Sequence, residues 1–257
     1  MKLPAPVEIL GVPVTPLRVA ELHAWMDARL AAGERAEILN VNVHALNLAY
    51  RQPWLRAYLR RAPLVFCDGA GVILGARILG RHIPERITYA DWMWQLAEHA
   101  AGQGYRLYFL GAQPGVAESA AQALQARFPT LKVVGCRDGY FDRTHGSPEN
   151  EQVVAEINRL KVDILILGMG MPLQERWLLE NWPALTARIG LTGGAVFDYL
   201  SGRVKRAPDW MNRRSLEWLG RLWIEPARLW RRYLFGNPPF LLRVLAQRLG
   251  VLKLPQE

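Results

Sequence analysis

Residues 106–128 read RLYFLGAQPGVAESAAQALQARF, and this stretch decides the fold. Its short apolar start predicts a buried strand, the residues GAQPG predict a turn, and the remainder predicts a helix. The same order returns in residues 163–181, DILILGMGMPLQERWLLEN. Short apolar strands that alternate with helices predict an α/β fold, in which helices cover both faces of a mostly parallel sheet.

The alternation continues on both sides of these two units. The further predicted elements are a strand or hairpin arm at 7–14, a helix from Thr15 to about 32, a strand at 38–43, a helix at 44–60, a strand at 64–67 followed by a helix, a helix from Thr88 to about 102, a strand at 132–136, a helix at 149–160, a strand at 188–191 and a helix at 195–201. The composition then changes near Gly202, where the alternation stops.

The excess charge of the chain lies in its C-terminal stretch. The whole chain has a net charge of +9, and residues 203–253 hold twelve Lys or Arg against three Asp or Glu, so the rest of the chain is balanced. We therefore expect two parts: an α/β body over residues 1–202 that carries the activity, and a basic, Trp-rich helical appendage over 203–257 that docks on a partner.

The pattern within the appendage favours a membrane surface as that partner. Residues 215–234 have apolar residues at helical spacing, which would form one face of a helix. Arginines that include Arg221 and Arg228 recur every seven residues and would form a second line along the same helix. Residues 237–239, Asn-Pro-Pro, are expected to break this helix, and residues 240–252 to form a second amphipathic segment. Trp and Arg on short helices suit an anionic leaflet. The alternative is an ordinary helix packed on the core with solvated arginines.

Several function classes are not expected. No basic face or binding motif for nucleic acid occurs elsewhere in the chain. The only two cysteines, Cys67 and Cys136, form no zinc or disulfide pattern, which predicts a reducing cytoplasm and an inert Cys67. We expect no signal peptide, and the apolar runs fall short of the roughly 20 residues of a spanning helix. With no Asp-x-Asp and no histidine pair at helical spacing, neither a metal site nor a cofactor is expected.

Ligands of an open α/β sheet bind beyond the carboxyl ends of its strands. Three predicted turns place Gly111, Gly170 and Gly193 there. Glycine lets the backbone approach a phosphate, and the N-terminus of the next helix offers N–H groups, which favours a nucleotide diphosphate. The alternative is that these glycines only make tight turns. The turn at Gly111 matches neither the dinucleotide fingerprint nor a P-loop.

Asp68 and Arg86 are the charged candidates at this edge. Asp68 directly follows the apolar run Leu-Val-Phe-Cys, where partial desolvation would suit a general base, although it could instead cap the next helix. Arg86 precedes the predicted helix start at Thr88 and could bind a phosphate or a sugar carboxylate. The alternative for Arg86 is a solvated surface charge.

Four neutral or acidic candidates complete the predicted site. Gln174 and Glu175 open a helix after Met-Pro, where their side chains could reach a ligand or serve as caps. Asn40 and Asn42 alternate on one face of a strand and could hydrogen-bond hydroxyl groups, although buried asparagines usually satisfy backbone groups instead.

Six blocks of the sequence resemble, in order, the WecG/TagA/CpsF family, glycosyltransferase family 26. They are ILNVNVHALNLA (38–49), FCDGAGVIL (66–74), PERITYAD (84–91), LGMGMPLQERW (167–177), GLTGGAVFDYLSGRVKRAPDW (190–210) and LEWLGRLWIEPARLWRRYL (216–234). The resemblance implies a Rossmann-like fold and an inverting, metal-independent transfer of a sugar from a UDP-linked donor. It implies an acceptor sugar on a polyprenyl diphosphate lipid, and a protein held peripherally at the cytoplasmic face of the plasma membrane.

The resemblance also implies roles for individual residues. Asp68 is similar to the family's general base, and Arg86 and Gln174, placed with it in the catalytic group, resemble pocket residues that hold donor and acceptor. Asn42 resembles a pocket residue. The appendage arginines Arg221, Arg228 and Arg231 resemble groups that reach the diphosphates. Two departures concern substrate choice: Asn40 stands where the family often has Thr, and Tyr89 where Thr-Gly is common.

Two other classes stay open at this stage. One is a nucleotide-dependent oxidoreductase or methyltransferase that uses the turn 111–115, and the other is a non-enzymatic peripheral membrane adaptor. A homo-oligomer is compatible with either, and with the transferase.

Overall fold

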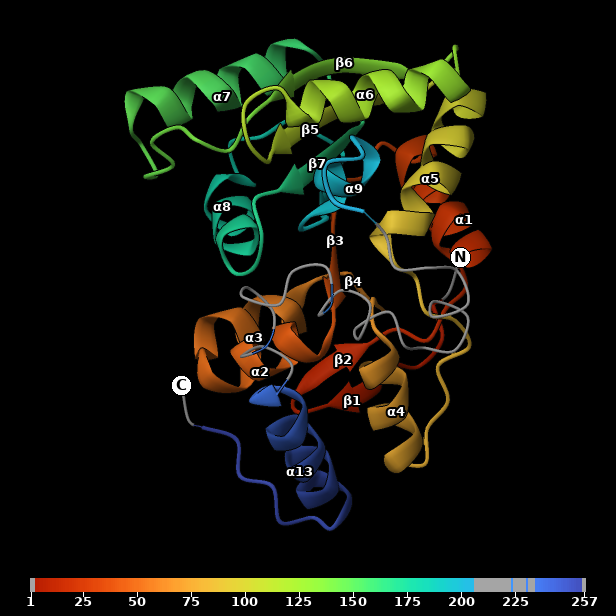
Figure 1. The fold of residues 1–257 in the computed structure, drawn as a ribbon, viewed down its shortest axis with the longest axis vertical. Helices are drawn as coiled ribbons and strands as arrows, with labels where there is room; N and C mark the ends of the chain where they lie inside the picture. The colour runs from red at the N-terminus through yellow and green to blue at the C-terminus, as the bar shows by residue number, and fades with distance from the viewer. Residues whose placement is uncertain (1–2, 206–222, 224–229, 231–233, 256–257) are drawn as a thin grey trace.

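A six-stranded parallel sheet forms the centre of the computed structural model, which describes residues 3–205, 223, 230 and 234–255. The strands are β3 (Ala36–Val41), β4 (Leu64–Cys67), β5 (Arg106–Gly111), β6 (Lys132–Arg137), β7 (Ile164–Gly168) and β8 (Ile189–Thr192). Their order in the sheet is β4-β3-β8-β7-β5-β6, and every pairing is parallel (Figure 1). The predicted α/β, Rossmann-like class is confirmed.

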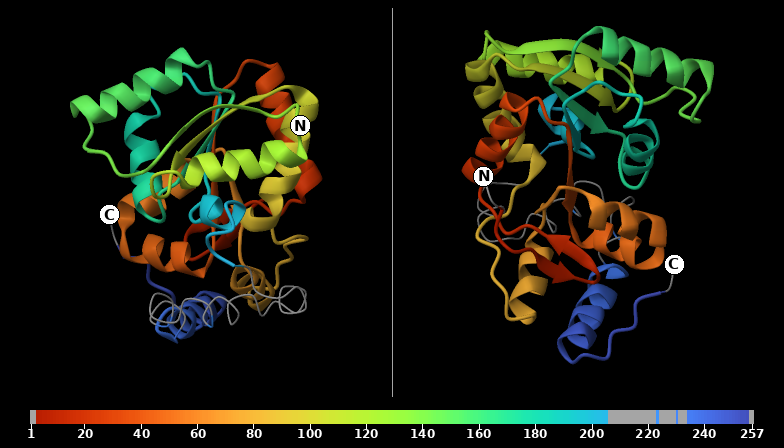
Figure 2. Two further views of the ribbon diagram at one scale, coloured as in Figure 1. Left: turned by 45° about the horizontal axis from the view of Figure 1, so that its top comes forward. Right: turned by 180° about the vertical axis from the view of Figure 1, so that it is seen from behind.

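Helices cover both faces of this sheet. One face carries α1 (Val19–Ala31), α5 (Tyr89–Gln103), α6 (Val116–Arg127) and α9 (Val196–Leu200). The other carries α2 (Val43–Arg51), α3 (Pro53–Arg61), α4 (Ala70–Ile78), α7 (Pro148–Arg159), α8 (Leu173–Asn181) and α13 (Asn237–Arg248). A two-stranded hairpin, β1 (Val7–Ile9) and β2 (Val12–Val14), adds to the second layer (Figure 2).

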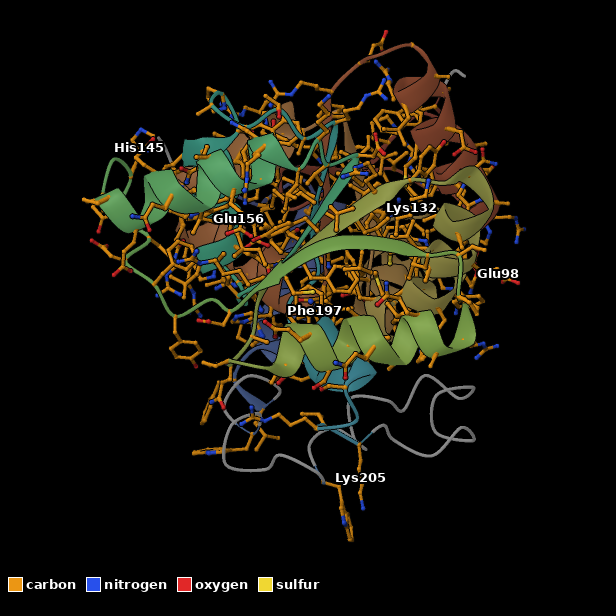
Figure 3. The ribbon with its side chains drawn as sticks, turned by 90° about the horizontal axis from the view of Figure 1, so that it is seen from above. Glu98, Lys132, His145, Glu156, Phe197 and Lys205 are labelled. Atoms are coloured by element: carbon orange, nitrogen blue, oxygen red, sulfur yellow. The ribbon has the colours of Figure 1, made fainter. Side chains whose placement is uncertain are left out.

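Successive strand residues enter opposite layers, as the period of a β-strand requires. On β5, the Tyr108 hydroxyl donates to Glu156 of α7 at 2.7 Å. Its neighbour Phe109 stacks on Phe197 of α9, with ring centroids 4.9 Å apart. Figure 3 shows Glu156 and Phe197 on opposite sides of the strands. Apolar strands in which both sides are buried therefore hold the two layers together.

Proline explains two differences between the predicted and the observed helices. The helix predicted at 44–60 is divided into α2 and α3 by Pro53, which begins α3. Proline lacks an N–H and clashes with the carbonyl four residues earlier, so a continuous helix does not pass it. The Asn-Pro-Pro at 237–239 opens α13, which therefore begins three residues before the predicted start at 240, because prolines fit the first turn.

The described end of the C-terminal stretch is packed into the body. Phe240 and Val244 of α13 are fully buried in the core layer shared with α2 and α4. Gln247 accepts from the backbone N–H of Leu10 at 2.8 Å and donates to the carbonyl of Glu8 at 2.8 Å. The predicted boundary at 202 therefore does not separate residues 237–255 from the α/β body.

The outer side of α13 is apolar and exposed. Leu242, Leu245 and Leu249 are 66%, 45% and 74% exposed. Across the residues that the structure describes, no helix is both long and apolar enough to cross a membrane. The predicted amphipathic helix at 215–234 lies almost entirely outside the described residues.

Candidate active site

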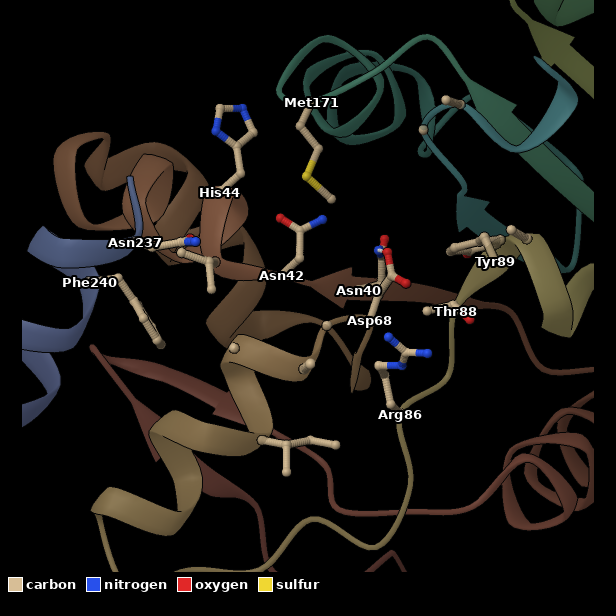
Figure 4. A pocket seen from close by; sticks show the side chains of 18 of the residues that line it. Asn40, Asn42, His44, Asp68, Arg86, Thr88, Tyr89, Met171, Asn237 and Phe240 are labelled. Atoms are coloured by element: carbon tan, nitrogen blue, oxygen red, sulfur yellow. Dashed lines mark hydrogen bonds between the residues drawn. The ribbon is translucent and has the colours of Figure 1, made fainter. Parts of the chain in front are cut away.

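A cavity of about 820 Å³ opens beyond the carboxyl ends of β3, β4, β7 and β8 (Figure 4). The topology places it there. The connections after β3 and β7 lead to helices on one face of the sheet, whereas the connection after β8 leads to α9 on the other. A crevice forms where neighbouring strands send their helices to opposite faces. Its volume is typical of a site for a small-molecule ligand.

Asp68 lies in this cavity, immediately after β4. Its backbone N–H donates to Val41 at 2.8 Å, which anchors it to the neighbouring strand. Its side-chain Oδ2 accepts from Asn40 Nδ2 at 3.0 Å. The N-cap of α4 is Gly69, so the structure does not support the alternative that Asp68 is the capping residue.

Asn40 is held in one orientation. It is buried on β3, and its Oδ1 accepts from the Thr192 hydroxyl of β8 at 3.2 Å while its Nδ2 donates to Asp68. If the amide were turned over, its oxygen would face the Asp68 carboxylate, which only accepts, so the bond to Asp68 defines the nitrogen end. Asn40 therefore fixes one oxygen of the Asp68 carboxylate.

Asn42 lies at the cavity wall and also caps a helix. Strand β3 ends at Val41, two residues before the predicted end at Val43, so Asn42 is not on the strand. Asn42 thus becomes the N-cap of α2, and its Oδ1 accepts from Ala45 N at 3.1 Å. The alternative interpretation, an asparagine that satisfies a backbone group, is what this bond shows. Figure 4 places Asn42 beside His44 and Met171.

Arg86 and Thr88 reach the cavity from the segment between α4 and α5. The backbone N–H of Ile87 donates to Cys67 at 2.9 Å, which ties this segment to the end of β4. Both Arg86 and Thr88 line the cavity, and Figure 4 shows the Arg86 guanidinium turned toward Asp68. Arg86 is half-buried rather than fully solvated. Thr88 is the N-cap of α5, and its hydroxyl donates to Asp91 at 3.0 Å.

The three predicted glycine positions do not behave alike. Gly170 and Gly193 line the cavity. However, the N–H of Gly170 donates to the Gln174 side chain and that of Gly193 to Leu167 O, so neither is directed at a ligand. Gly111 lies away from the cavity, where β5 runs against β7: a Cβ there would be 2.4 Å from the carbonyl carbon of Gly168. Gly111 is required for packing.

Gln174 and Glu175 lie behind the cavity wall, on the first turn of α8. Both are almost fully buried. Gln174 Oε1 accepts from the N–H groups of Gly170 at 3.2 Å and Gly194 at 2.9 Å, and its Nε2 donates to Glu175 Oε1 at 2.8 Å. Burial raises the pKa of Glu175 to about 7. The structure thus gives Gln174 a place between two loops and not in the open cavity.

Several lining residues were missed by sequence reasoning. They are His44, Arg77, Tyr199, Asn237, Phe240 and Leu241. Arg77 shares a face of α4 with Ala70, Ile73 and Leu74, at the spacing of one helical stripe, and this spacing could have indicated it. The lining residues of α13 had no such local signal, because their position depends on contacts with distant parts of the chain.

Other predicted groups fall outside the cavity or outside the described residues. Burial raises the pKa of the Cys67 thiol to about 12, in agreement with an inert core cysteine. Within the described part of the chain, no group of three or more His, Cys, Asp or Glu side chains could hold a metal ion. Arg221, Arg228 and Arg231 lie outside the described residues.

Sequence comparisons identify the family and the relatives of this chain. The sequence model described as "Glycosyl transferase WecG/TagA/CpsF family" matches residues 7–253. The N-acetylglucosaminyldiphosphoundecaprenol N-acetyl-beta-D-mannosaminyltransferase of Bacillus subtilis strain 168 is 31% identical over 190 residues, which cover 74% of this chain and 71% of that protein. The protein of the same name from Staphylococcus aureus strain MRSA252 is 28% identical over 243 residues, covering 93% of this chain and 92% of that protein.

Proposed function

The chain belongs to the WecG/TagA/CpsF family of glycosyl transferases, and from this premise we propose that it transfers a sugar from a UDP-sugar to a sugar carried on polyprenyl diphosphate. Relatives named for N-acetylmannosaminyl transfer to N-acetylglucosaminyldiphosphoundecaprenol support this choice of substrates. UDP-N-acetylmannosamine and that lipid are therefore the first pair to test. The product would enter a cell-surface polysaccharide or glycolipid.

The observation that carries the proposal is the Asp68 carboxylate in the cavity, with one oxygen held by Asn40 at 3.0 Å. In the proposed step, Asp68 takes the proton of the acceptor hydroxyl as its oxygen attacks the anomeric carbon of the donor. A carbon–oxygen bond to the acceptor forms and the bond to the diphosphate breaks. UDP leaves with the bonding electrons, and the configuration at the anomeric carbon inverts.

Arginines are the groups proposed to compensate the charge of the leaving diphosphate. Arg77 of α4 and Arg86 of the segment before α5 both line the cavity. Preorganised cations that face a developing negative charge stabilise the transition state more than water does. We extend this role to Arg221, Arg228 and Arg231 of the appendage, and the reaction we propose needs no metal ion.

The lipid acceptor requires a surface at which a membrane lipid can enter. The cavity wall has an apolar part formed by Leu74, Phe240 and Leu241 of α4 and α13. Exposed leucines on α13 and the basic residues of 203–253 suit contact with an anionic leaflet. We propose peripheral attachment to the cytoplasmic membrane face through this region.

The test is a transfer assay on vesicles with 20% anionic lipid that contain N-acetylglucosaminyldiphosphoundecaprenol. We expect UDP release that depends on both substrates and persists in excess EDTA. Strict dependence on added Mg²⁺ or Mn²⁺ would refute the metal-independent mechanism. Sedimentation of the protein with these vesicles tests attachment separately, and its failure would refute the peripheral docking.

Nucleotide binding separates the proposal from its rivals. We expect UDP and UDP-sugars to raise the melting temperature, and NAD and S-adenosylmethionine to leave it unchanged. A rise with NAD or S-adenosylmethionine alone would favour the oxidoreductase or methyltransferase. Vesicle binding with no response to any nucleotide would favour the adaptor.

A further inference from the structure

Two loops form one wall of the cavity, and one buried side chain holds them together. The loop after β7 contains Gly170 and the loop after β8 contains Gly194, and both residues line the cavity. The backbone N–H groups of both donate to the same atom, Gln174 Oε1, at 3.2 Å and 2.9 Å. Gln174 thus replaces the backbone partner that these two turns lack.

The orientation of the Gln174 amide decides whether this link exists. If the amide were turned over, its Nε2 would face two N–H donors, and both contacts would become repulsive. Glu175 prevents this, because its Oε1 accepts from Nε2 at 2.8 Å and so defines the nitrogen end. A carboxyl oxygen accepts such a bond whether Glu175 is ionised or protonated.

We propose that Glu175 is a positioning residue, whose buried carboxyl orients the Gln174 amide and thereby fixes the Gly170 and Gly194 loops that form the donor-binding wall of the cavity. The word "donor" rests on the proposed transferase function. The positioning of the loops does not depend on it.

The burial of Glu175 supports a positioning role over a stabilising one. Only 3% of its surface is exposed, and no residue that the structure describes makes a hydrogen bond to its Oε2. An unsatisfied buried carboxyl oxygen costs folding free energy. Burial also raises the pKa of this group to about 7, as expected for a carboxyl that lacks compensating charge. Glu175 therefore contributes through what it orients.

The same wall is continuous with the support of Asp68. Gly194 follows Thr192 by two residues, and the Thr192 hydroxyl donates to Asn40, which in turn donates to Asp68. If the β8–α9 loop became more mobile, the position of the carboxylate of the proposed general base, Asp68, would therefore also become less fixed. We expect effects of Glu175 on both the binding and the chemical step, with the binding step affected more directly.

The first experiment measures loop opening without any substrate. Hydrogen exchange followed by mass spectrometry on the full chain compares Glu175→Leu, Glu175→Gln and Glu180→Leu with the unsubstituted protein. Leucine removes the acceptor, and glutamine keeps an acceptor oxygen. Glu180 is a matched control, because it lies on the same helix but pairs with the surface residue Arg176 at 3.6 Å.

We expect at least about tenfold faster exchange of peptides that cover Gly170 and Gly194 in Glu175→Leu only. Unchanged exchange in these peptides would overturn the proposal. Faster exchange throughout the chain would do the same, because it would show a general stabilising role. If the leucine variant does not fold, Gln174→Met with Glu175 intact gives the same readout, and protected loops in that variant would overturn the link through Gln174.

The second experiment measures transfer kinetics and coupling. Glu175→Leu is expected to raise the KM for the UDP-sugar about tenfold with a smaller fall in kcat. Glu175→Gln is expected to keep a KM close to that of the unsubstituted protein, because glutamine retains an acceptor oxygen. The effects of Glu175→Leu and Gln174→Met should not add in the double variant, because one residue acts through the other. Additive effects would overturn the proposal. Absence of transfer in the unsubstituted protein would refute the proposed function and leave the exchange result standing.

Discussion

The turn after β5 and the turn after β7 end neighbouring strands of the sheet, and both are rich in glycine, yet only the second lines the cavity. After β5, Ala112 N donates to Gly168 and Ala112 O accepts from Gly139, so this turn is bound to other backbone groups. After β7, the turn is held by a side chain, Gln174, and two of its residues, Gly170 and Met171, line the cavity. Glycine marks a tight turn in both places, whereas the polar side chains around the turn mark the site.

The assignment of chemistry to the β3–β4–β8 side of the sheet is tested most severely by Asp68→Asn. We expect kcat to fall about 100- to 10,000-fold, because the amide cannot take the proton of the acceptor. The free energy of unfolding should change by less than about 1 kcal/mol, since the residue lies in an open cavity. Asp138→Asn, outside the cavity, is the control. An active Asp68→Asn would refute the general-base role.

The packing role of the β5 turn predicts the next largest effect, from Gly111→Ala. The added Cβ would lie 2.4 Å from the carbonyl carbon of Gly168, so backbone must move. We expect a loss of about 3 kcal/mol in the free energy of unfolding, measured by urea denaturation at a temperature where the variant stays folded. The KM for the UDP-sugar should stay unchanged in the folded variant. A raised KM with an unchanged free energy of unfolding would contradict the packing role and show that the β5 turn contributes to substrate binding.

Glu175→Gln tests the electrostatics behind the β7 turn. The pKa of Glu175 is raised from 4.5 to about 7 in the folded protein. The folded state therefore binds the proton more tightly, and the stability that this group contributes is lost as the pH rises from about 4.5 to about 7. At pH 8, Glu175→Gln should be more stable than the unsubstituted protein by about 3 kcal/mol.

The stability difference between Glu175→Gln and the unsubstituted protein should depend on pH. The advantage of the glutamine variant should shrink as the pH falls from about 7 and disappear below about 4.5, where Glu175 is protonated in both states. Urea denaturation at several pH values provides the measurement. An advantage that does not vary with pH would show that Glu175 is not the titrating group.

The smallest expected effect comes from a matched pair of glycines, one in each turn. Gly170 and Gly115 have φ angles of +82° and +81°, and a Cβ on either would meet no atom within 4 Å. Alanine at each position should cost about 1 kcal/mol of stability, because both residues adopt the left-handed conformation. Only Gly170→Ala should raise the KM for the UDP-sugar, because only Gly170 lines the cavity. Equal KM values would remove the distinction between the turns.

The sheet could be predicted from the sequence because each strand is indicated by a pattern of neighbouring residues. Apolar runs of strand length with glycine turns recur along the chain, and the strands form where these runs occur. The position of Asp68 followed from the same logic, since the end of a parallel strand must lie at the ligand-binding edge. A shift of strand β3 by two residues was enough to move Asn42 from the strand to a helix cap, because local patterns define boundaries poorly.

The roles of Gln174 and α13 could not be predicted, because they depend on contacts between distant segments. Gln174 joins two loops whose glycines are 24 residues apart in the sequence, as the positions of Gly170 and Gly194 show. Asn47 donates to Gly236 O across 189 residues. Periodicity within one helix identifies its buried face but not the element against which that face packs.

The two hydrogen bonds between Gln247 and the β1–β2 hairpin have a consequence for folding during biosynthesis. They join positions that are separated by 237 and 239 residues in the sequence, so they cannot form until α13 has left the ribosome. The sheet can assemble earlier, but the cavity wall at Phe240 is completed among the last steps of folding, and contacts of such sequence separation form slowly. Because β8 lies between β3 and β7, the sheet itself closes only after residue 192 has left the ribosome. From then until α13 emerges, a nascent chain would present an open, apolar-edged cavity, and this is the stage at which a chaperone would matter most.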